Sequence, residues 1–171
     1  LGQMAERRFR ELFNDSPVGL FRSGLDGKIM EVNPAMASML GFRDPEQLRE
    51  KFATMLDVYA DPGERQAMVD RAMRDGSFSN QEMRVLDAGG KVRWVSSNVR
   101  LTRDEHNAPA HFTGSAVDVQ ERRQMQQALI SSENKYRTLV EQSHVGVFIM
   151  DESTLVYVNR AMADMLGMAD K

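Results

Sequence analysis

The sequence predicts an α+β protein in the order helix, two strands, several helices and three strands. Three observations support this prediction. Turn pairs rich in Asp and Gly separate short runs of β-branched and aromatic residues. An Asn or Asp followed directly by Pro opens three helical stretches in the middle of the chain. After position 120 the apolar residues return to helical spacing.

The first helix is predicted over residues 3–14, where apolar residues recur at approximately helical spacing. The Ser-Pro pair at 16–17 ends it, because the residue before a proline disfavours the helical conformation. Two short strands follow, at 18–23 and 28–32. The Asp-Gly pair at 26–27 predicts a tight hairpin turn between them.

The middle helices each begin with a residue suited to capping. Asn33 precedes a proline, a favourable first helical residue, and we expect its side chain to be a structural cap worth about 1 kcal/mol. The same device recurs at Asp44 and Asp61. Glu64, three residues after Asp61, predicts a capping box. The helix that follows ends at Asp75-Gly76 and has an apolar face made of Met68, Val69, Ala72 and Met73.

Three further strands are predicted over 78–86, 91–102 and 110–119, the first two joined by a turn at 87–90. Apolar residues occupy both faces of the middle strand, which indicates that both sides of the sheet are covered. One face holds Val92 and Trp94, and the other holds Val95, Val99 and Leu101.

A helix from 120 to 140 follows the last strand. Steps of three and four residues define a seam in which four of six positions are apolar, as in an imperfect coiled coil. We expect this seam to pair two subunits in a homodimer. The alternative is one amphipathic helix that lies on its own domain. The seam residues are Arg122, Met125, Leu129, Ser132, Tyr136 and Leu139.

The chain contains an internal repeat. Residues 9–21 match 136–148 at six identical positions, and 32–41 match 158–167 at eight. A second copy of the domain therefore begins near residue 136, and we expect the chain to be part of a longer protein. The predicted organisation is an N-terminal flanking helix (1–15), a first domain (16–119), a helical connector (120–141) and the truncated start of a second domain (142–171).

Composition narrows the classes of function. The 171 residues carry a formal net charge of −3, so no large basic field favours nucleic acid as a partner. The absence of cysteine excludes disulfides, thiolate metal sites and a cysteine nucleophile. No apolar run is long enough to span a bilayer, and charged residues interrupt any signal peptide. We expect a cytoplasmic location without membrane contact by this segment, which leaves open an anchor elsewhere in the parent protein.

Three segments resemble the PAS sensory domain: SPVGLFRSGLDGKIMEVNPAMASMLGF at 16–42, EMRVLDAGGKVRW at 82–94 and GSAVDVQER at 114–122. The third is similar to the family's Asp-Ile-Thr-Glu-Arg exit signature. Asp118 and Glu121-Arg122 match that signature, whereas Gln120 stands where Thr is usual. The resemblance covers residues 7–122 and, as an incomplete second domain, 135–171.

The resemblance implies a five-stranded antiparallel sheet in the order 2-1-5-4-3, with helices on one face and a small-molecule cavity between them. It also implies a downstream output domain, such as a histidine kinase or diguanylate cyclase, in the same bacterial protein. We expect the signal to leave through the junction with the connector. The predicted relay residues are Asp118, Glu121, Arg122, Met125 and Leu129.

The identity of a ligand or cofactor is not predicted. Haem is disfavoured because the helix at 62–74 lacks the histidine that such domains place there, and a cysteine-adduct flavin is disfavoured because there is no cysteine. We expect the purified protein to be colourless. The candidate ligand-binding residues are Tyr59, Arg84, Trp94 and Asn98, because Arg can hold a carboxylate and aromatic rings can wall a ligand. In the alternative, Arg84 pairs with Glu82 or Asp118 and Trp94 is a packing residue.

No catalytic or metal-binding motif is present, so we expect no enzyme activity in this segment. The leading interpretation is a sensory and dimerisation module that binds a small ligand and relays the signal through its C-terminal helix. One alternative is a ligand-free dimerisation and spacer module. The other is a small-molecule carrier or enzyme that uses the same cavity.

Overall fold

The computed structural model describes residues 2–168 and divides into two units, Leu1–Gln120 and Glu121–Lys171. The helices of the first unit lie at the N-terminus and between the second and third strands: α1 (Gly2–Asp15), α2 (Pro34–Met39), α3 (Pro45–Lys51), α4 (Met55–Val58) and α5 (Pro62–Asp75). Its strands are β1 (Gly19–Gly24), β2 (Ile29–Val32), β3 (Ser77–Leu86), β4 (Val92–Arg103) and β5 (Pro109–Asp118).

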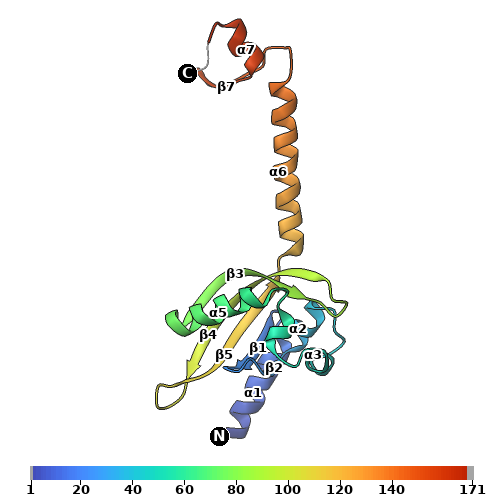
Figure 1. Cartoon of the computed structure of the whole chain (residues 1–171), viewed down its shortest axis with the longest axis vertical. Coiled ribbons are helices and arrows are strands. Elements are labelled where there is room, and N and C mark those ends of the chain that lie inside the picture. Colours follow the sequence, from blue (N-terminus) through green and yellow to red (C-terminus); the bar gives the residue numbers. More distant parts are fainter. Residues whose placement is uncertain (1, 169–171) are drawn as a thin grey trace. The chain divides into compact units, whose positions relative to one another are not determined.

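The five strands form one antiparallel sheet in the order β2-β1-β5-β4-β3, which confirms the predicted fold class and topology. The first and last strands of the domain therefore lie side by side at its centre, with Phe21 opposite Gly114. Helices α2 to α5 lie against one face of this sheet (Figure 1). The last strand, β5, thus runs through the middle of the domain before the chain leaves it.

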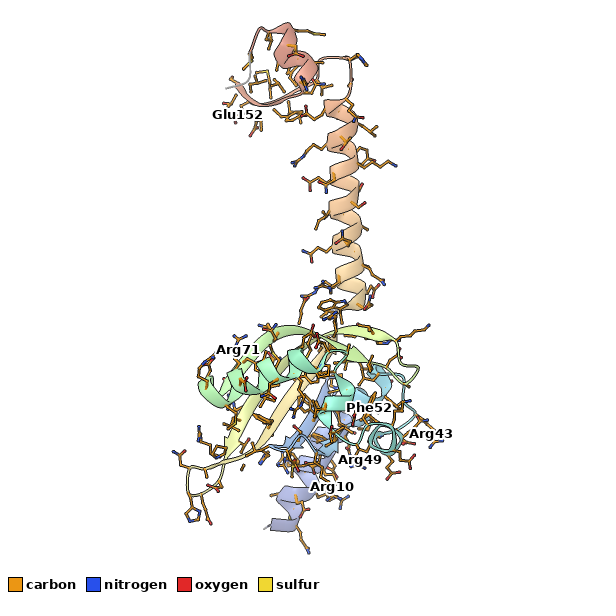
Figure 2. All side chains as sticks on the ribbon, in the orientation of Figure 1. Arg10, Arg43, Arg49, Phe52, Arg71 and Glu152 are labelled. Atoms are coloured by element: carbon orange, nitrogen blue, oxygen red, sulfur yellow. The ribbon has the colours of Figure 1, made fainter. Side chains whose placement is uncertain are left out.

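Strand alternation decides which side chains enter the core. On β4, Val95, Ser97 and Val99 face the helices and are buried, and the residues between them face the other side of the sheet. Aromatic residues that follow α2 and α3 contribute to the core, where Phe42 and Phe52 pack edge to face with ring centroids 5.5 Å apart. Phe52 is labelled in Figure 2. The buried layer between sheet and helices is therefore almost entirely apolar.

Local capping explains where most helices begin. The side chains of Asn33, Asp44 and Asp61 cap α2, α3 and α5. The expected capping box at Asp61 is absent, because Glu64 binds Arg84 instead. A capping box occurs instead at α4, a helix that the sequence analysis did not identify, where the Asp57 carboxylate accepts the Thr54 N–H at 2.9 Å.

Asn33 does more than cap α2. It is fully buried, and its Oδ1 accepts the N–H groups of Leu20 at 2.8 Å and Met36 at 2.9 Å. Its Nδ2 donates to the carbonyl groups of Phe13 at 3.0 Å and Val18 at 2.9 Å. One side chain therefore joins the end of α1, the start of β1 and the first turn of α2.

The second unit repeats this arrangement after the connector helix α6 (Gln120–Glu141). It contains β6 (Phe148–Asp151), β7 (Thr154–Val158) and α7 (Arg160–Met165), and β6 pairs antiparallel with β7. Asn159 is fully buried and accepts from Val147 and Met162 while donating to Val140 and Val145. The repeat in the sequence is thus also a repeat in the structure, because the four hydrogen bonds of Asn159 are equivalent to the four of Asn33.

The apolar residues of the α6 seam are exposed within the single chain. Met125, Leu129, Tyr136 and Leu139 are each more than half exposed, and no residue of α6 is buried. A search of residues 2–168 finds no helix with the length and apolar character that crossing a bilayer requires.

Candidate functional site

A small apolar cavity lies between the sheet and the helices of the first unit. Its volume is about 40 Å³, and its walls come from β1 to β5, from α2 to α4 and from Tyr59. The only polar side chains in its wall are the Ser97 hydroxyl, which donates to the Ser115 carbonyl at 2.8 Å, and the Tyr59 phenol. Its lining residues include Phe21, Met36, Val58, Met83, Val95 and Ala116. We call it the apolar cavity.

A second cavity of about 30 Å³ adjoins the first, under α5. Phe21, Met55 and Tyr59 line both cavities and form the partition between them. The second cavity also contains Arg65, 8% exposed, and Ser23, 4% exposed. We call it the arginine cavity. Both volumes are far below the ~300–1,000 Å³ of sites for drug-sized ligands, so they have room for only a few heavy atoms.

Of the four predicted ligand-binding residues, only Tyr59 lines these cavities. Arg84 pairs in register with Trp94, and both alternate with residues that face the core. Asn98 lies on the same outer face of the sheet as Trp94. A ligand in either cavity would therefore meet Tyr59 but not Arg84, Trp94 or Asn98.

Arg84 and Asn98 have structural partners instead. Arg84 Nε donates to Glu64 at 2.8 Å, and its guanidinium lies 3.7 Å from Asp61, so it fastens the edge strand β3 to the start of α5. The expected alternative pairing of Arg84 with Asp118 is wrong. Asn98 accepts the N–H of Asn80 at 2.8 Å, where β3 departs from regular pairing with β4.

Tyr59 is the polar group most affected by the core. Burial raises the pKa of its phenol to about 12, and the nearby positive charge of Arg65 opposes this rise in the pKa. The phenol therefore stays protonated at neutral pH and keeps a proton that it can donate to a ligand.

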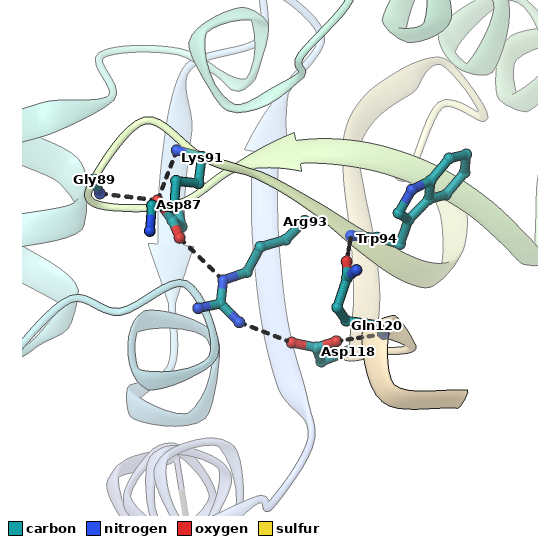
Figure 3. Close-up of polar contacts among 7 residues, drawn as sticks. All are labelled: Asp87, Gly89, Lys91, Arg93, Trp94, Asp118 and Gln120. Carbon is teal, nitrogen blue, oxygen red and sulfur yellow. Dashed lines mark hydrogen bonds and ion pairs between the residues drawn. The ribbon is translucent and has the colours of Figure 1, made fainter. Parts of the chain in front are cut away.

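The junction between the sheet and the connector contains a continuous polar network (Figure 3). Arg93 on β4 donates from Nε to Asp87 at 3.1 Å and from Nη1 to Asp118 at 3.4 Å. The other oxygen of Asp118 accepts the N–H of Gln120, the first residue of α6, at 2.7 Å. A positive charge between two carboxylates thus connects the β3–β4 turn, the end of β5 and the first turn of the connector.

Two further contacts hold the ends of this network. The Gln120 side chain accepts the N–H of Trp94 at 3.3 Å, so it ties α6 back to β4 at the position where the family usually has Thr. Asp87 accepts the N–H groups of Lys91 and Gly89, both at 2.9 Å. The Lys91 bond, with the Arg93 contact, keeps the pKa of Asp87 below its usual value. Asp87 is therefore a fixed negative anchor for Arg93.

The other predicted relay residues lie on α6 beyond this network. Glu121 and Arg122 follow Gln120 directly, and Met125 and Leu129 are 63% and 68% exposed on the seam. Sequence reasoning missed Arg93 and Arg65. Arg65 precedes Met68, Val69 and Ala72 by three, four and seven residues, so it belongs to the apolar face of its helix, and that spacing could have identified it.

No three acidic or histidine side chains in residues 2–168 gather in an arrangement that could hold a metal ion.

Comparison with known families agrees with this fold. A family model described as "PAS fold" matches residues 13–124, and one described as "PAS domain" matches residues 134–171. The chain therefore belongs to the PAS family, and two family models match successive parts of it.

Two kinds of relative are similar to the chain. The two-component sensor PprA of Pseudomonas aeruginosa is 27% identical over 172 residues, which cover 96% of this chain and 18% of that protein. The chain thus spans less than a fifth of that relative's length. A PAS domain from Colwellia psychrerythraea is 18% identical, with a TM-score of 0.57 over 69% of this chain and 98% of that one.

A sensory box histidine kinase/response regulator from Burkholderia thailandensis is 20% identical, with a TM-score of 0.57 over 77% of this chain and 98% of that structure. At these identities the solved structures support the fold.

Proposed function

We propose that the chain is a sensory and dimerisation module of a bacterial two-component signalling protein. A small ligand in the cavities of the first domain alters the end of β5, and the junction network transmits the change to α6. The observation that carries this proposal is the chain of contacts from Asp87 through Arg93 and Asp118 to the first N–H of the connector. The similarity to a two-component sensor supports the kind of parent protein.

The route from cavity to connector is short. Ala116 lines the apolar cavity and lies two residues before Asp118 on the same central strand. Because interiors are closely packed, a ligand that enlarges the cavity must displace β5 or the helices opposite it. Displacement of β5 changes the separation between Asp118 and Arg93, and so changes how firmly the first turn of α6 is held.

Pairing of two chains gives the connector a second state to occupy. The exposed seam would bury Met125, Leu129, Tyr136 and Leu139 against the same residues of a second copy. A paired helix can shift its packing between two arrangements, and a ligand that binds one arrangement better changes their populations. The seam therefore supplies the two-state element that the relay needs.

The ligand-free spacer is the second candidate function, and the small size of both cavities favours it. A carrier or enzyme using the same cavity has no comparable support. Native mass spectrometry of the purified chain distinguishes these functions. A retained small molecule supports sensing or carriage, turnover supports an enzyme, and a chain that remains empty with every candidate ligand supports the spacer.

The relay itself is tested in the parent protein. Arg93→Met should uncouple phosphoryl output from the stimulus while leaving the domain folded, because the Arg93 pair with Asp118 is partly exposed and the buried Asp87 keeps the N–H groups of Gly89 and Lys91 as donors. Arg74→Met removes a comparable exposed pair with Asp75, far from the junction in sequence, and should leave the response intact. A normal response in Arg93→Met would contradict the proposed route.

A further inference from the structure

The arginine cavity is lined by an arginine that has no ion-pair partner within the described part of the chain. Arg65 is only 8% exposed, and its side chain forms no hydrogen bond or ion pair with residues 2–168. The adjacent Glu64 already binds Arg84 at 2.8 Å. No side-chain nitrogen of the described residues is both fully buried and without a hydrogen bond, so the guanidinium nitrogens of Arg65 remain accessible. The Arg65 guanidinium is therefore open to an anion, which it can hold by charge-assisted hydrogen bonds.

Close packing holds the guanidinium in place. Its Nη2 lies 2.6 Å from the position that a Cβ atom on Gly27 would occupy. Gly27 has a φ of +86°, which only glycine adopts without strain. The glycine of the β1–β2 turn thus lets Arg65 lie directly against the turn backbone.

Two hydroxyl groups share the cavity with Arg65. Ser23 and Tyr59 both line it, and neither hydroxyl forms a hydrogen bond with another part of the described chain, residues 2–168. Tyr59 is close enough to Arg65 for the two groups to interact electrostatically. A planar guanidinium and two hydroxyl donors around one small space match the two acceptor oxygens of a carboxylate.

We propose that the ligand is a short aliphatic carboxylate. Its head group binds Arg65, Ser23 and Tyr59 in the arginine cavity, and its chain extends into the apolar cavity. The volumes of about 30 and 40 Å³ limit it to a few heavy atoms. Met55 lies in the partition, and its flexible side chain can move to join the two spaces. The proposal rests on the sensory function proposed above and names the class of ligand sensed.

The test uses the whole 171-residue chain with acetate, propionate and butyrate at constant ionic strength. Acetamide serves as the neutral counterpart of acetate. Binding is measured by saturation-transfer NMR and by the rise in thermal unfolding temperature. We expect acetate to bind at least about tenfold more tightly than acetamide, because a charged acceptor strengthens the bonds to Arg65. Affinity should then rise about three- to fourfold with each added CH₂ group.

Arg65→Met removes the charge at similar length and should weaken acetate binding at least about tenfold. Arg74→Met is the control on the same helix, because Arg74 pairs with Asp75 at 2.9 Å on the exposed surface and lines neither cavity. It should bind acetate as the wild type does. Equal affinity of the wild type for acetate and acetamide would overturn the proposal, as would unchanged acetate binding in Arg65→Met.

If Arg65→Met does not fold, the comparison of acetate with acetamide decides alone. The two proposals also fail in different ways. Binding of acetamide without a preference for acetate overturns the anionic ligand and leaves the sensory function in place. Binding of acetate that never alters the output of the parent protein supports the anion site and contradicts the sensory function.

Discussion

Asn33 and Asn159 are the residues on which each repeat of the fold depends most. Each is fully buried and makes four hydrogen bonds, two through its carbonyl oxygen and two through its amide nitrogen. Asn33 holds the carbonyl of Phe13 in α1, and Asn159 holds that of Val140 in α6. The helix that enters each domain is therefore fastened to that domain's first strand and first helix by one side chain.

Asn33→Ala should destabilise the first domain by about 3 kcal/mol or more. A helix cap alone is worth about 1 kcal/mol, but this substitution also takes the Asn33 donor from the part-buried Phe13 carbonyl and the Asn33 acceptor from the part-buried Leu20 N–H. The Val18 carbonyl keeps the Ser16 hydroxyl as a donor at 3.1 Å. Urea unfolding monitored by near-UV circular dichroism measures the change. Asn134→Ala, on the exposed surface of α6, is the matched control and should change stability by less than about 0.5 kcal/mol. A loss near 1 kcal/mol for Asn33→Ala would show that only the cap contributes.

Tyr59 should make stability depend on pH in the alkaline range. Burial raises the pKa of its phenol to about 12 in the folded chain. Between the unfolded pKa near 10 and this value, the unfolded state releases a proton that the folded state keeps, so stability falls as pH rises. Tyr59 lowers the free energy of unfolding by at most about 1.4 kcal/mol for each pH unit in this range.

Urea unfolding at a series of pH values between 9 and 12 tests this expectation. Tyr59→Phe should show a shallower decline than the wild type. Tyr136→Phe, at an exposed position on α6, should decline as the wild type does. Identical pH dependence in wild type and Tyr59→Phe would mean that the phenol is not held protonated by burial.

At the scale of helices and strands, local chemistry explains which features the sequence predicted. Asn33, Asp44 and Asp61 signal helix starts by residue type and by the proline that follows, and the structure has all three. Helix α4 was missed because it has only four residues, although Thr54 and Asp57 carry a capping-box signal. The ion-pair partner of Glu64 was not predicted, because that partner, Arg84, is twenty residues away in the sequence.

The candidate site was harder to predict because it depends on which face of each element is covered. Alternation along β4 places Trp94 and Asn98 opposite Val95 and Val99, so this pattern was available in the sequence and should have excluded them from the cavity. Arg93 joins the network only because the ends of β4 and β5 and the β3–β4 turn meet. The contact between these segments depends on tertiary structure, so no local sequence pattern predicts it.

The connector α6 should determine the oligomeric state. Leu129→Asp places a charge at the centre of the seam and should convert a dimer to a monomer in sedimentation velocity experiments. Gln127→Asp introduces the same charge on the opposite side of the helix and should leave the dimer intact. Equal sedimentation of Leu129→Asp and the wild type would show that the seam is only an amphipathic face.

For the whole molecule, the central claim is that the cavities and the connector are coupled through the junction. The second repeat makes this coupling more general, because Asn159 binds the end of α6 as Asn33 binds the end of α1. A change in α6 thus has a defined point of entry into the second domain. The coupling can be tested without knowing the ligand, because a larger side chain in the cavity imitates occupancy.

The most direct measurement is amide hydrogen exchange in the first turns of α6. Ala116→Val fills part of the apolar cavity and should change these exchange rates at least about threefold, within the range of known coupling energies. Adding Asp118→Asn, which weakens the bonds to Arg93 and Gln120, should abolish that response. Two results would contradict this coupling. Ala116→Val could leave the exchange rates in α6 unchanged, or it could change them by the same factor whether or not Asp118→Asn is present.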